Sequence, residues 1–170
     1  SSLHSSTMSV TLISSDDKTF QIERSFLKHA GAIEEFIKER KLDNAALETK
    51  PIRLDIKGLA LQRVKIWLTL HRDDPVQDYS KETDMKSYKI PGVDAFYFQH
   101  LSMADHSELV MAAEMLKIKG LSDFCAKAIA NSFKGKNSTQ LREMLNIKND
   151  FTPEQEEKIL RDDIWAKLRL

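Results

Sequence analysis

The order of two sequence patterns constrains the fold of this chain more than any other feature. Short segments that alternate and are rich in β-branched residues occur early, at residues 10–14, 19–22 and 51–56. Such segments are typical of half-buried β-strands, and residues 15–18 predict the turn of a hairpin. From Val93 onward, the apolar residues follow the period of a helix instead. This order predicts an α+β fold, with three strands early and helices late.

Two helical regions are expected around the third strand. Residues 25–41 predict one or two short helices with a break at Gly31. Their apolar stripe is formed by Ile33, Phe36 and Ile37. Residues 59–72 predict a longer helix, whose broad apolar face is formed by Leu59, Val64, Trp67, Leu68 and Leu70. We expect these apolar faces to lie in the core.

Residues 73–89 lack the composition of a packed segment. Charged side chains dominate between Asp73 and Lys89, and aliphatic side chains are almost absent. Burial of such a segment cannot offset the entropy lost when it is ordered. We therefore expect a mobile loop.

Capping and breaking signals divide the helical half of the chain. Asp105 and Glu108 have the spacing of a capping box, which predicts the start of a helix. Gly120 is expected to interrupt the helical pattern after Ile118. Gly135 suits the C-terminal end of the helix that follows.

Two further helix starts are expected near the C-terminus. Asn137 with Gln140 predicts a short helix, and Thr-Pro-Glu-Gln at 152–155 predicts a last helix that runs through Trp165. A terminal helix needs either the domain itself or a partner to pack on. The apolar stripe available for this packing is formed by Leu160, Ile164, Trp165 and Leu168.

The charge balance argues against two classes of partner. Lys and Arg number 26, and Asp and Glu also number 26. The chain therefore has no overall field to attract nucleic acid or an anionic membrane, and we expect neither partner. No stretch reaches the roughly 20 apolar residues needed to span a bilayer. We expect residues 1–8 to form a disordered tail or a vector remnant, with Met8 as the native start.

Side chains that could carry catalysis form no recognisable constellation. The five histidines are scattered, and none stands in a metal-binding helix pattern with another His or with Glu. The single Cys125 is expected on a buried helix face, where a thiol is inert. That face is formed by Leu121, Phe124, Ala128 and Ile129. We therefore expect no enzyme activity, no catalytic residue, no metal and no cofactor.

The helix around residues 105–116 is expected to have two different faces. Leu109, Ala113 and Leu116 fall together on a helical wheel and are predicted core residues. Met111 and Met115 fall on roughly the opposite side. Methionines on that side predict an adaptable surface for a partner, although a neighbouring helix would cover them equally well.

Three blocks in the C-terminal half resemble one known family. Ile-Lys-Gly-Leu-Ser-Asp at 118–123 is followed, at the family's spacing, by Lys-Gly-Lys at 134–136 and by Asn-Ile-Lys-Asn-Asp-Phe-Thr-Pro-Glu at 146–154. Ser-Ser-Asp-Asp at 14–17 and Asp-Asp-Pro at 73–75 also match. On these residues, the chain resembles the Skp family, the adaptor subunits of SCF (Skp–cullin–F-box) ubiquitin ligases.

The resemblance implies a BTB/POZ domain followed by two C-terminal helices. The small three-stranded sheet and its helices would occupy residues 9–134, and residues 135–170 would form the helices that bind the F-box. The implied function is a non-catalytic adaptor that links F-box substrate receptors to a cullin. The resemblance also implies a homodimer for the free chain, and a location in cytoplasm and nucleus.

The resemblance assigns residues to each binding surface. Residues matching the cullin-binding helix are Met111, Glu114 and Met115. Pro153 matches a proline that is hydroxylated in family members from some unicellular organisms, which makes it a candidate modification site. The implied F-box surface contains Leu121, Phe124, Leu141, Ile147, Asn149, Phe151 and Trp165.

The chain departs from the family pattern on the helix that would face the cullin. Where the family has Asn-Tyr, this chain has Glu114 and Met115, which add a charge and replace a rigid ring by a flexible thioether. The residues after Trp165 are also more apolar and basic than the family's acidic ending. These departures predict a divergent paralogue. It is either an adaptor with altered cullin binding or an F-box-binding or self-assembling scaffold that has lost its cullin.

Overall fold

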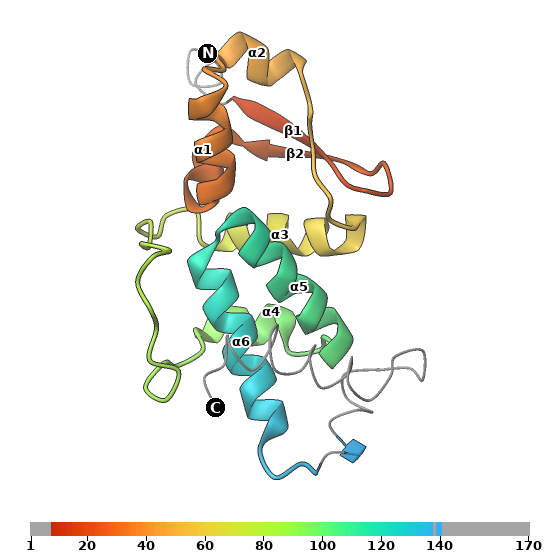
Figure 1. The fold of residues 1–170 in the computed structure, drawn as a ribbon, viewed down its shortest axis with the longest axis vertical. Coiled ribbons are helices and arrows are strands. Elements are labelled where there is room, and N and C mark those ends of the chain that lie inside the picture. The colour runs from red at the N-terminus through yellow and green to blue at the C-terminus, as the bar shows by residue number, and fades with distance from the viewer. Residues whose placement is uncertain (1–7, 138, 141–170) are drawn as a thin grey trace. The chain divides into compact units, whose positions relative to one another are not determined.

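The computed structural model describes residues 8–137 and 139–140 of the chain. The chain divides into two compact units (Figure 1). The first contains Ser1–Ser80 and Ala112–Lys119, and the second contains Lys81–Met111 and Gly120–Leu170. Among the described residues, the strands lie in the first unit, and the second consists of helices and loops.

The sheet of the first unit confirms the three predicted strands and the α+β class. β1 (Ser9–Ile13) pairs antiparallel with β2 (Thr19–Glu23) and parallel with β3 (Ile52–Arg53), which gives the order β2-β1-β3. Val10 and Leu12 of the central strand are fully buried, as the alternation of apolar residues predicts. β3 is shorter than the predicted strand because only two of its residues pair in register with β1.

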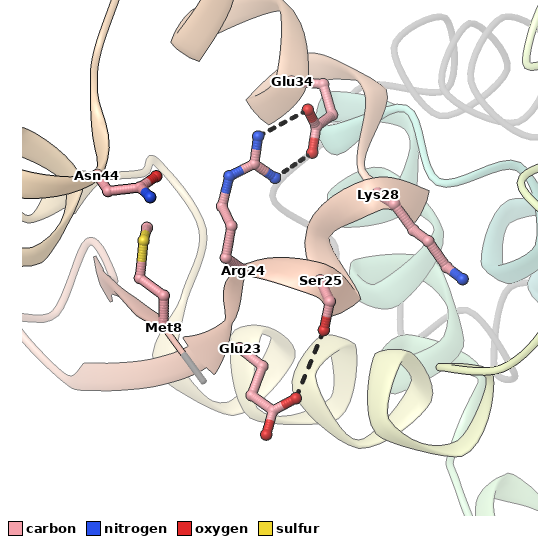
Figure 2. Close-up of a pocket in the computed structure, with 7 residues that line it drawn as sticks. All are labelled: Met8, Glu23, Arg24, Ser25, Lys28, Glu34 and Asn44. Carbon is pink, nitrogen blue, oxygen red and sulfur yellow. Dashed lines mark hydrogen bonds and ion pairs between the residues drawn. The ribbon is translucent and has the colours of Figure 1, made fainter. Parts of the chain in front are cut away.

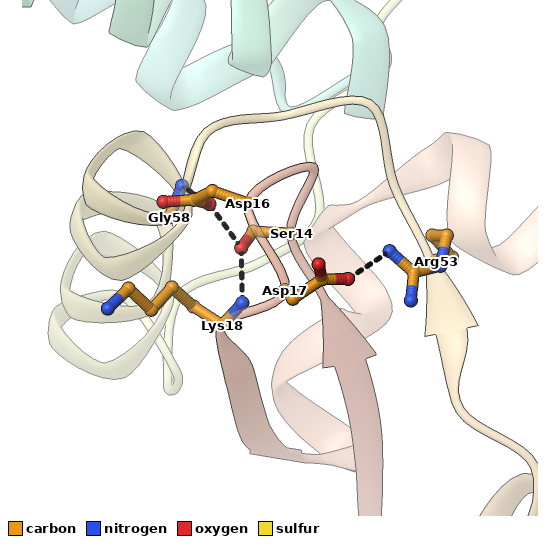
Figure 3. A network of polar contacts seen from close by, with 6 residues as sticks. All are labelled: Ser14, Asp16, Asp17, Lys18, Arg53 and Gly58. Atoms are coloured by element: carbon orange, nitrogen blue, oxygen red, sulfur yellow. Dashed lines mark hydrogen bonds and ion pairs between the residues drawn. The ribbon is translucent and has the colours of Figure 1, made fainter.

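A polar network joins the hairpin turn to the first residue of α3 (Gly58–Leu70), as Figure 3 shows. The Oγ of Ser14 donates a hydrogen bond to Oδ1 of Asp16 at 2.6 Å and accepts one from the backbone N–H of Lys18 at 2.9 Å. The same Asp16 oxygen accepts the backbone N–H of Gly58 at 2.7 Å. These hydrogen bonds, of which the one from Ser14 has the largest effect, hold the pKa of Asp16 below its usual value. An aspartate from a distant turn therefore caps α3.

The segment between β2 and β3 contains three short helical elements. η2 (Arg24–His29) is a 3-10 helix and α1 (Gly31–Glu39) follows it, which confirms the predicted break near Gly31. α2 (Asn44–Thr49) was not predicted. It begins where the carboxylate of Asp43 accepts the backbone N–H of Ala46 at 2.8 Å, a local cap.

The core face of α3 differs from the predicted one at its first turn. Val64, Trp67 and Leu68 are buried as expected. Leu59 is 54% exposed, so its predicted place in the core is wrong. The buried face begins with its neighbours Ala60 and Leu61, which turns the Leu59 side chain toward solvent.

The start and end of α5 (Met103–Leu116) correct two predicted boundaries. The Oγ of Ser102 accepts the backbone N–H of Asp105 at 3.1 Å, so Ser102 caps this helix and Asp105 lies in its first turn. The break after α5 comes at Lys117, whose φ of 55° is in the left-handed region. Gly120 does not interrupt the pattern, because it lies in the first turn of the next helix.

The second unit contains α4 (Gly92–Phe98) and most of α6 (Lys119–Phe133). Gly135, with a φ of 71°, follows the end of α6 as predicted. Asn137 and Gln140 then exchange two hydrogen bonds of 3.0 Å and 2.9 Å, which confirms the predicted capping pair. The predicted last helix, and most of the segment 135–170, lie outside the described residues.

Residues 73–89 contain no helix or strand, but the second half of this loop is packed. Thr83 Oγ1 donates to Oδ2 of the buried Asp123 at 2.5 Å. Lys127 Nζ donates to the carbonyl oxygen of Met85. Burial raises the pKa of Tyr88. Polar contacts to α6 thus hold the second half of the loop, whose composition offers almost no aliphatic surface to bury. The mobility of the loop stays a prediction.

Candidate protein-binding surfaces

The described residues offer little that could carry catalysis. Among them, no group of three or more His, Cys, Asp or Glu side chains is placed to hold a metal ion. Cys125 is fully buried, which confirms its predicted place in the core and removes its thiol from solvent. Within the same part of the chain, every helix is too short or too polar to cross a membrane.

The exposed face of α5 carries the two methionines that the sequence predicts there. Met111 is 61% exposed and Met115 is 48% exposed, and the two lie one helical turn apart. Leu109 and Leu116, which were predicted to face the core, are buried. Glu114 is half-buried beside this face. The predicted division of α5 into two faces is confirmed, and cullin binding by these residues stays a prediction.

A second surface lies in the second unit and is named here the α4–α6 groove. It is a cavity of about 410 Å³ whose walls come from α4, the start of α5, and α6. Its apolar lining is formed by Ile90, Ala95, Phe98, Leu101, Met103, Phe124 and Ala128. Its polar lining is formed by Gln99, His106, Asn131 and Ser132. Concave apolar surfaces with a few polar groups are typical of binding sites.

Aromatic contacts fix the wall of the α4–α6 groove. The rings of Phe98 and Phe124 are 5.6 Å apart, which joins the end of α4 to α6. The ring of His106 meets Phe124 edge-on at 5.7 Å, which joins α5 to the same residue. Phe124 therefore holds three helices together and also lines the groove.

The structure describes two of the predicted F-box residues. Phe124 lines the groove although only 2% of it is exposed, and Leu121 is completely buried. Their contact with an F-box stays a prediction. The other predicted F-box residues, and the candidate hydroxylation site, lie outside the described residues: Leu141, Ile147, Asn149, Phe151, Trp165 and Pro153.

Sequence reasoning missed most of the α4–α6 groove. Met103, His106 and Asn131 line it, and none of them was a candidate. Met103 and His106 lie in the first turn of α5, whereas Asn131 lies in α6, so no spacing along one helix connects all three. The closest indication in the sequence was the burial expected for Phe124. It indicates that this face of α6 packs on other elements but does not show which elements lie opposite.

A larger cavity in the first unit is a weaker candidate (Figure 2). It measures about 790 Å³, and its most prominent feature is an ion pair. Two nitrogens of Arg24 bind the two carboxylate oxygens of Glu34 at 2.5 Å and 3.0 Å, which raises the pKa of Arg24. Lys28 points away from this pair in Figure 2. Because Glu34 already neutralises the guanidinium of Arg24, that group has little positive charge left with which to bind an anion.

Comparison with known proteins gives these surfaces a context. Residues 119–166 match the family model described as Skp1 family, dimerisation domain. A Skp1-related protein of Caenorhabditis elegans is 30% identical over 162 residues, which cover 93% of this chain and 91% of that protein. The chain belongs to the Skp1 family. The small three-stranded sheet with its surrounding helices is consistent with the BTB/POZ fold that the resemblance implies.

Two further relatives, one of them named as a subunit of a complex, are similar to this chain over nearly their whole length. The E3 ubiquitin ligase complex SCF subunit sconC of Talaromyces stipitatus is 33% identical over 163 residues, which cover 94% of this chain and 98% of that protein. The suppressor of kinetochore protein 1 of Schizosaccharomyces pombe is 29% identical over 94% of this chain and 98% of its own length. The Skp1 family match starts at Lys119, so it includes the α6 wall of the groove.

Proposed function

We propose that this chain is a non-catalytic adaptor that joins F-box substrate receptors to a cullin in an SCF ubiquitin ligase. Support comes from relatives named as SCF subunits, which align with it over nearly their whole length. The observation that carries the proposal is the α4–α6 groove, because its α6 wall lies inside the Skp1 family match. The groove and the methionine face of α5 would serve two different partners.

The α4–α6 groove has the chemistry that an amphipathic helix needs. Phe98 and Phe124 supply apolar surface in the groove, and His106 and Asn131 supply polar groups. Helices bind such grooves through apolar side chains spaced three or four residues apart, and the polar groups fix their orientation. We assign this groove to the F-box. The predicted F-box residues outside the described part of the chain, Leu141, Ile147, Asn149, Phe151 and Trp165, are assigned to the F-box by the resemblance alone.

The methionine face of α5 is assigned to the cullin. Met111 and Met115 present flexible, polarizable side chains to solvent, and such side chains adapt to the shape of a partner. Flexibility also has a cost, because rotamer freedom is lost on binding. We therefore expect a cullin affinity below that of a chain with an aromatic residue at position 115.

An adaptor of this kind performs no bond-breaking step. By holding a receptor and a cullin on one molecule, it turns their encounter into an intramolecular event with a raised effective concentration. What the adaptor must supply is two surfaces that bind independently and a fold that keeps them apart.

The test measures each partner separately with the full chain. Ala128→Arg places a bulky cation in the groove and should lower the affinity for an F-box segment about tenfold or more, with cullin affinity unchanged. Met115→Lys should do the reverse with an N-terminal cullin fragment. Gln62→Arg on the exposed surface of α3 is the control that should change neither. Loss of both affinities in either variant would contradict the assignment of two independent surfaces.

The scaffold without a cullin remains the second candidate, because Glu114 and Met115 stand where the resemblance implies Asn-Tyr. The same titrations separate the two functions. F-box binding without cullin binding would favour the scaffold. Recovery of cullin binding by Glu114→Asn with Met115→Tyr would show that these two residues caused the loss. Binding of neither partner would contradict both the adaptor and the F-box-binding scaffold, and would leave only a scaffold that assembles with itself.

A further inference from the structure

The end of α5 carries a residue that is unusual for its backbone conformation. Lys117 directly follows the helix and has a φ of 55°, in the left-handed region. Its backbone N–H donates to the carbonyl oxygen of Glu114 at 3.2 Å, and that of Ile118 donates to the carbonyl oxygen of Ala113 at 2.9 Å. These two bonds form a Schellman motif, whose left-handed position is usually occupied by glycine. A side chain crowds the backbone in this conformation, so lysine is less favourable there than glycine.

Lys117 contacts α1, which belongs to the same unit as the last turn of α5. Its Nζ donates to both carboxylate oxygens of Glu35, at 2.9 Å and 3.2 Å. Its carbonyl oxygen accepts the backbone N–H of Gly31, the first residue of α1, at 3.3 Å. A Cβ added to Gly31 would lie only 3.5 Å from Cβ of Lys117, so the two segments are closely packed. Lys117 therefore connects the end of α5 to α1 through its backbone and through its side chain.

This connection lies beside Met115. Met115 is 48% exposed and stands two residues before Lys117, in the last turn of α5. Ile118, on the other side of Lys117, is completely buried and anchors the motif in the core. The direction in which a side chain leaves a helix is set by the backbone of its turn. The contacts of Lys117 therefore hold the backbone that carries Met115.

The ion pair contributes little to the stability of the fold by itself. The side chains of Lys117 and Glu35 are 43% and 58% exposed, and exposed pairs of this kind are weak. A weak interaction can still select one of several arrangements of a turn, because a small difference in free energy changes their populations severalfold. Glycine cannot make this selection, because it has no side chain to pair with Glu35.

We propose that Lys117 is a positioning residue, whose ion pair with Glu35 holds the last turn of α5, and with it Met115, in the arrangement that a partner binds. Without the pair, a smaller fraction of the chains has this arrangement. The apparent affinity for the partner is reduced by the same factor. The positioning stands on contacts within the first unit, whereas its effect on cullin binding rests on the proposed function.

The first experiment measures hydrogen exchange in the full chain without any partner. The reporter is the amide of Gly31, which donates to the carbonyl oxygen of Lys117. Lys117→Glu places two carboxylates side by side, so this amide should exchange severalfold faster, while the amides of β1 keep their rates. Lys117→Glu with Glu35→Lys restores an ion pair with its charges exchanged and should restore the slow exchange. Unchanged exchange of Gly31 in Lys117→Glu would overturn the proposal.

The second experiment titrates the same variants with an N-terminal cullin fragment. Each single charge reversal, Lys117→Glu or Glu35→Lys, should weaken binding about two- to fivefold, and the double variant should bind within about twofold of the unaltered chain. Lys50→Glu is the control, because Lys50 is exposed in the first unit and the change of charge is the same. It should leave the affinity unchanged. No recovery in the double variant would mean that one of the two charges contacts the partner directly, which would overturn the positioning role.

Lys117→Gly separates positioning from stability. Glycine suits the left-handed conformation but lacks the ion pair, so the melting temperature should stay the same or rise while the cullin affinity falls about two- to fivefold. A purely structural role would move both quantities in the same direction, and an unchanged affinity would overturn the proposal. If neither the unaltered chain nor any variant binds the cullin fragment, the cullin assignment fails. The exchange of the Gly31 amide then decides by itself whether Lys117 positions the turn.

Discussion

The polar network of Ser14, Asp16 and Gly58 in the first unit is called the junction from here on. The junction and the α4–α6 groove of the second unit differ in how many of their groups already have a partner within the fold. At the junction, Asp16 accepts hydrogen bonds of 2.6 Å from Ser14 and 2.7 Å from Gly58. In the groove, Phe98 and Phe124 line a cavity of about 410 Å³. A satisfied polar network has little to offer a partner, whereas apolar surface gains free energy each time water leaves it.

This contrast separates the parts of the chain that hold the fold from the parts that are available to a partner. The junction uses backbone groups and short side chains, so its partners are set by geometry within a few tenths of an ångström. The groove uses rings and a methionine, whose contacts are non-directional and tolerate several shapes of partner. Phe124 has both roles, because it is nearly buried in the fold and still lines the cavity that is available to a partner.

The largest expected effect tests this double role of Phe124. Phe124→Ala removes a ring that contacts Phe98 and His106, so we expect a loss of about 3–5 kcal/mol in the free energy of unfolding. Phe96→Ala is the matched control, because Phe96 belongs to the same unit and is 70% exposed. Its loss should stay within about 0.5 kcal/mol. Urea denaturation measures both, and equal losses would show that Phe124 is no more a core residue than Phe96.

A smaller effect is expected where the loop 73–89 meets α6. Thr83→Ala removes the hydroxyl that donates to the buried Asp123, and we expect a loss of about 1–3 kcal/mol in the free energy of unfolding. Ser80→Ala deletes a hydroxyl that also donates to an aspartate, Asp78, at 2.6 Å, but at an exposed position. That change should fall within about 0.5 kcal/mol.

The comparison of these two variants decides whether the loop contributes to stability. If Thr83→Ala is as mild as Ser80→Ala, the whole loop is dispensable for folding, as its composition suggests. If Ser80→Ala is as severe as Thr83→Ala, then both halves of the loop pack on the domain. Only the expected difference supports a loop that is packed in its second half alone.

Features that depend on neighbours in sequence could be predicted. The strands follow from alternation, and the capping pair Asn137 and Gln140 follows from a spacing of three residues. The exposed side of α5, with Met111 and Met115, follows from the helical period. In each case, the physical cause acts within about one or two turns of the chain.

Features that join distant residues could not be predicted. The cap of α3 comes from Asp16, which lies 42 residues before Gly58, and no local pattern connects them. The groove needs His106 and Phe124 from two helices, whose rings meet only after folding. The contact of Thr83 with Asp123 is of the same kind, and it was missed because the loop was judged by composition alone.

A third prediction places the same substitution in each region. At Gly58, an added Cβ would lie 2.6 Å from Cγ of Lys18 and 3.0 Å from Oδ1 of Asp16, so the junction must shift. We expect Gly58→Ala to lower the free energy of unfolding by about 1 kcal/mol, after the helix propensity gained is counted. At Gly92, the first residue of α4, nothing lies within 4 Å of the added Cβ. Gly92→Ala should therefore be neutral or stabilising by up to about 1 kcal/mol.

Thermal unfolding of both glycine variants measures how far the two regions differ. The expected result is a destabilising Gly58→Ala beside a neutral or stabilising Gly92→Ala, because the substitution is the same and only the surroundings differ. A stabilising Gly58→Ala would mean that the bonds of Asp16 tolerate a shift of several tenths of an ångström. The junction would then be as adaptable as the groove, and the contrast drawn between them would fail.

The smallest expected effect is a pH dependence that belongs to the first unit. The Nε2 of His29 lies 2.8 Å from the carbonyl oxygen of His71, and the ring of His29 meets Trp67 edge-on at 5.8 Å. Burial is the largest cause that lowers the pKa of His29 below its usual value, and the nearby charges of Lys28 and Asp74 act in opposite directions. The buried ring is therefore favoured in its neutral form, with the N–H on Nε2 donating to that oxygen.

The sign of the effect follows from proton binding in the two states. Because the folded-state pKa of His29 lies below its unfolded value of about 6.5, the unfolded chain takes up a proton first as the pH falls. Its contribution to stability is complete above about pH 6.5 and is lost as the pH falls toward the folded-state pKa.

His29→Gln keeps an N–H donor and removes the titration, so the urea midpoint of this variant should fall less between about pH 7.5 and about pH 5.5 than that of the unaltered chain. Every other titratable group is common to both chains, so the difference isolates His29. Equal slopes would mean that protonated His29 is tolerated inside the first unit, and that its surroundings are less fixed than the hydrogen bonds imply.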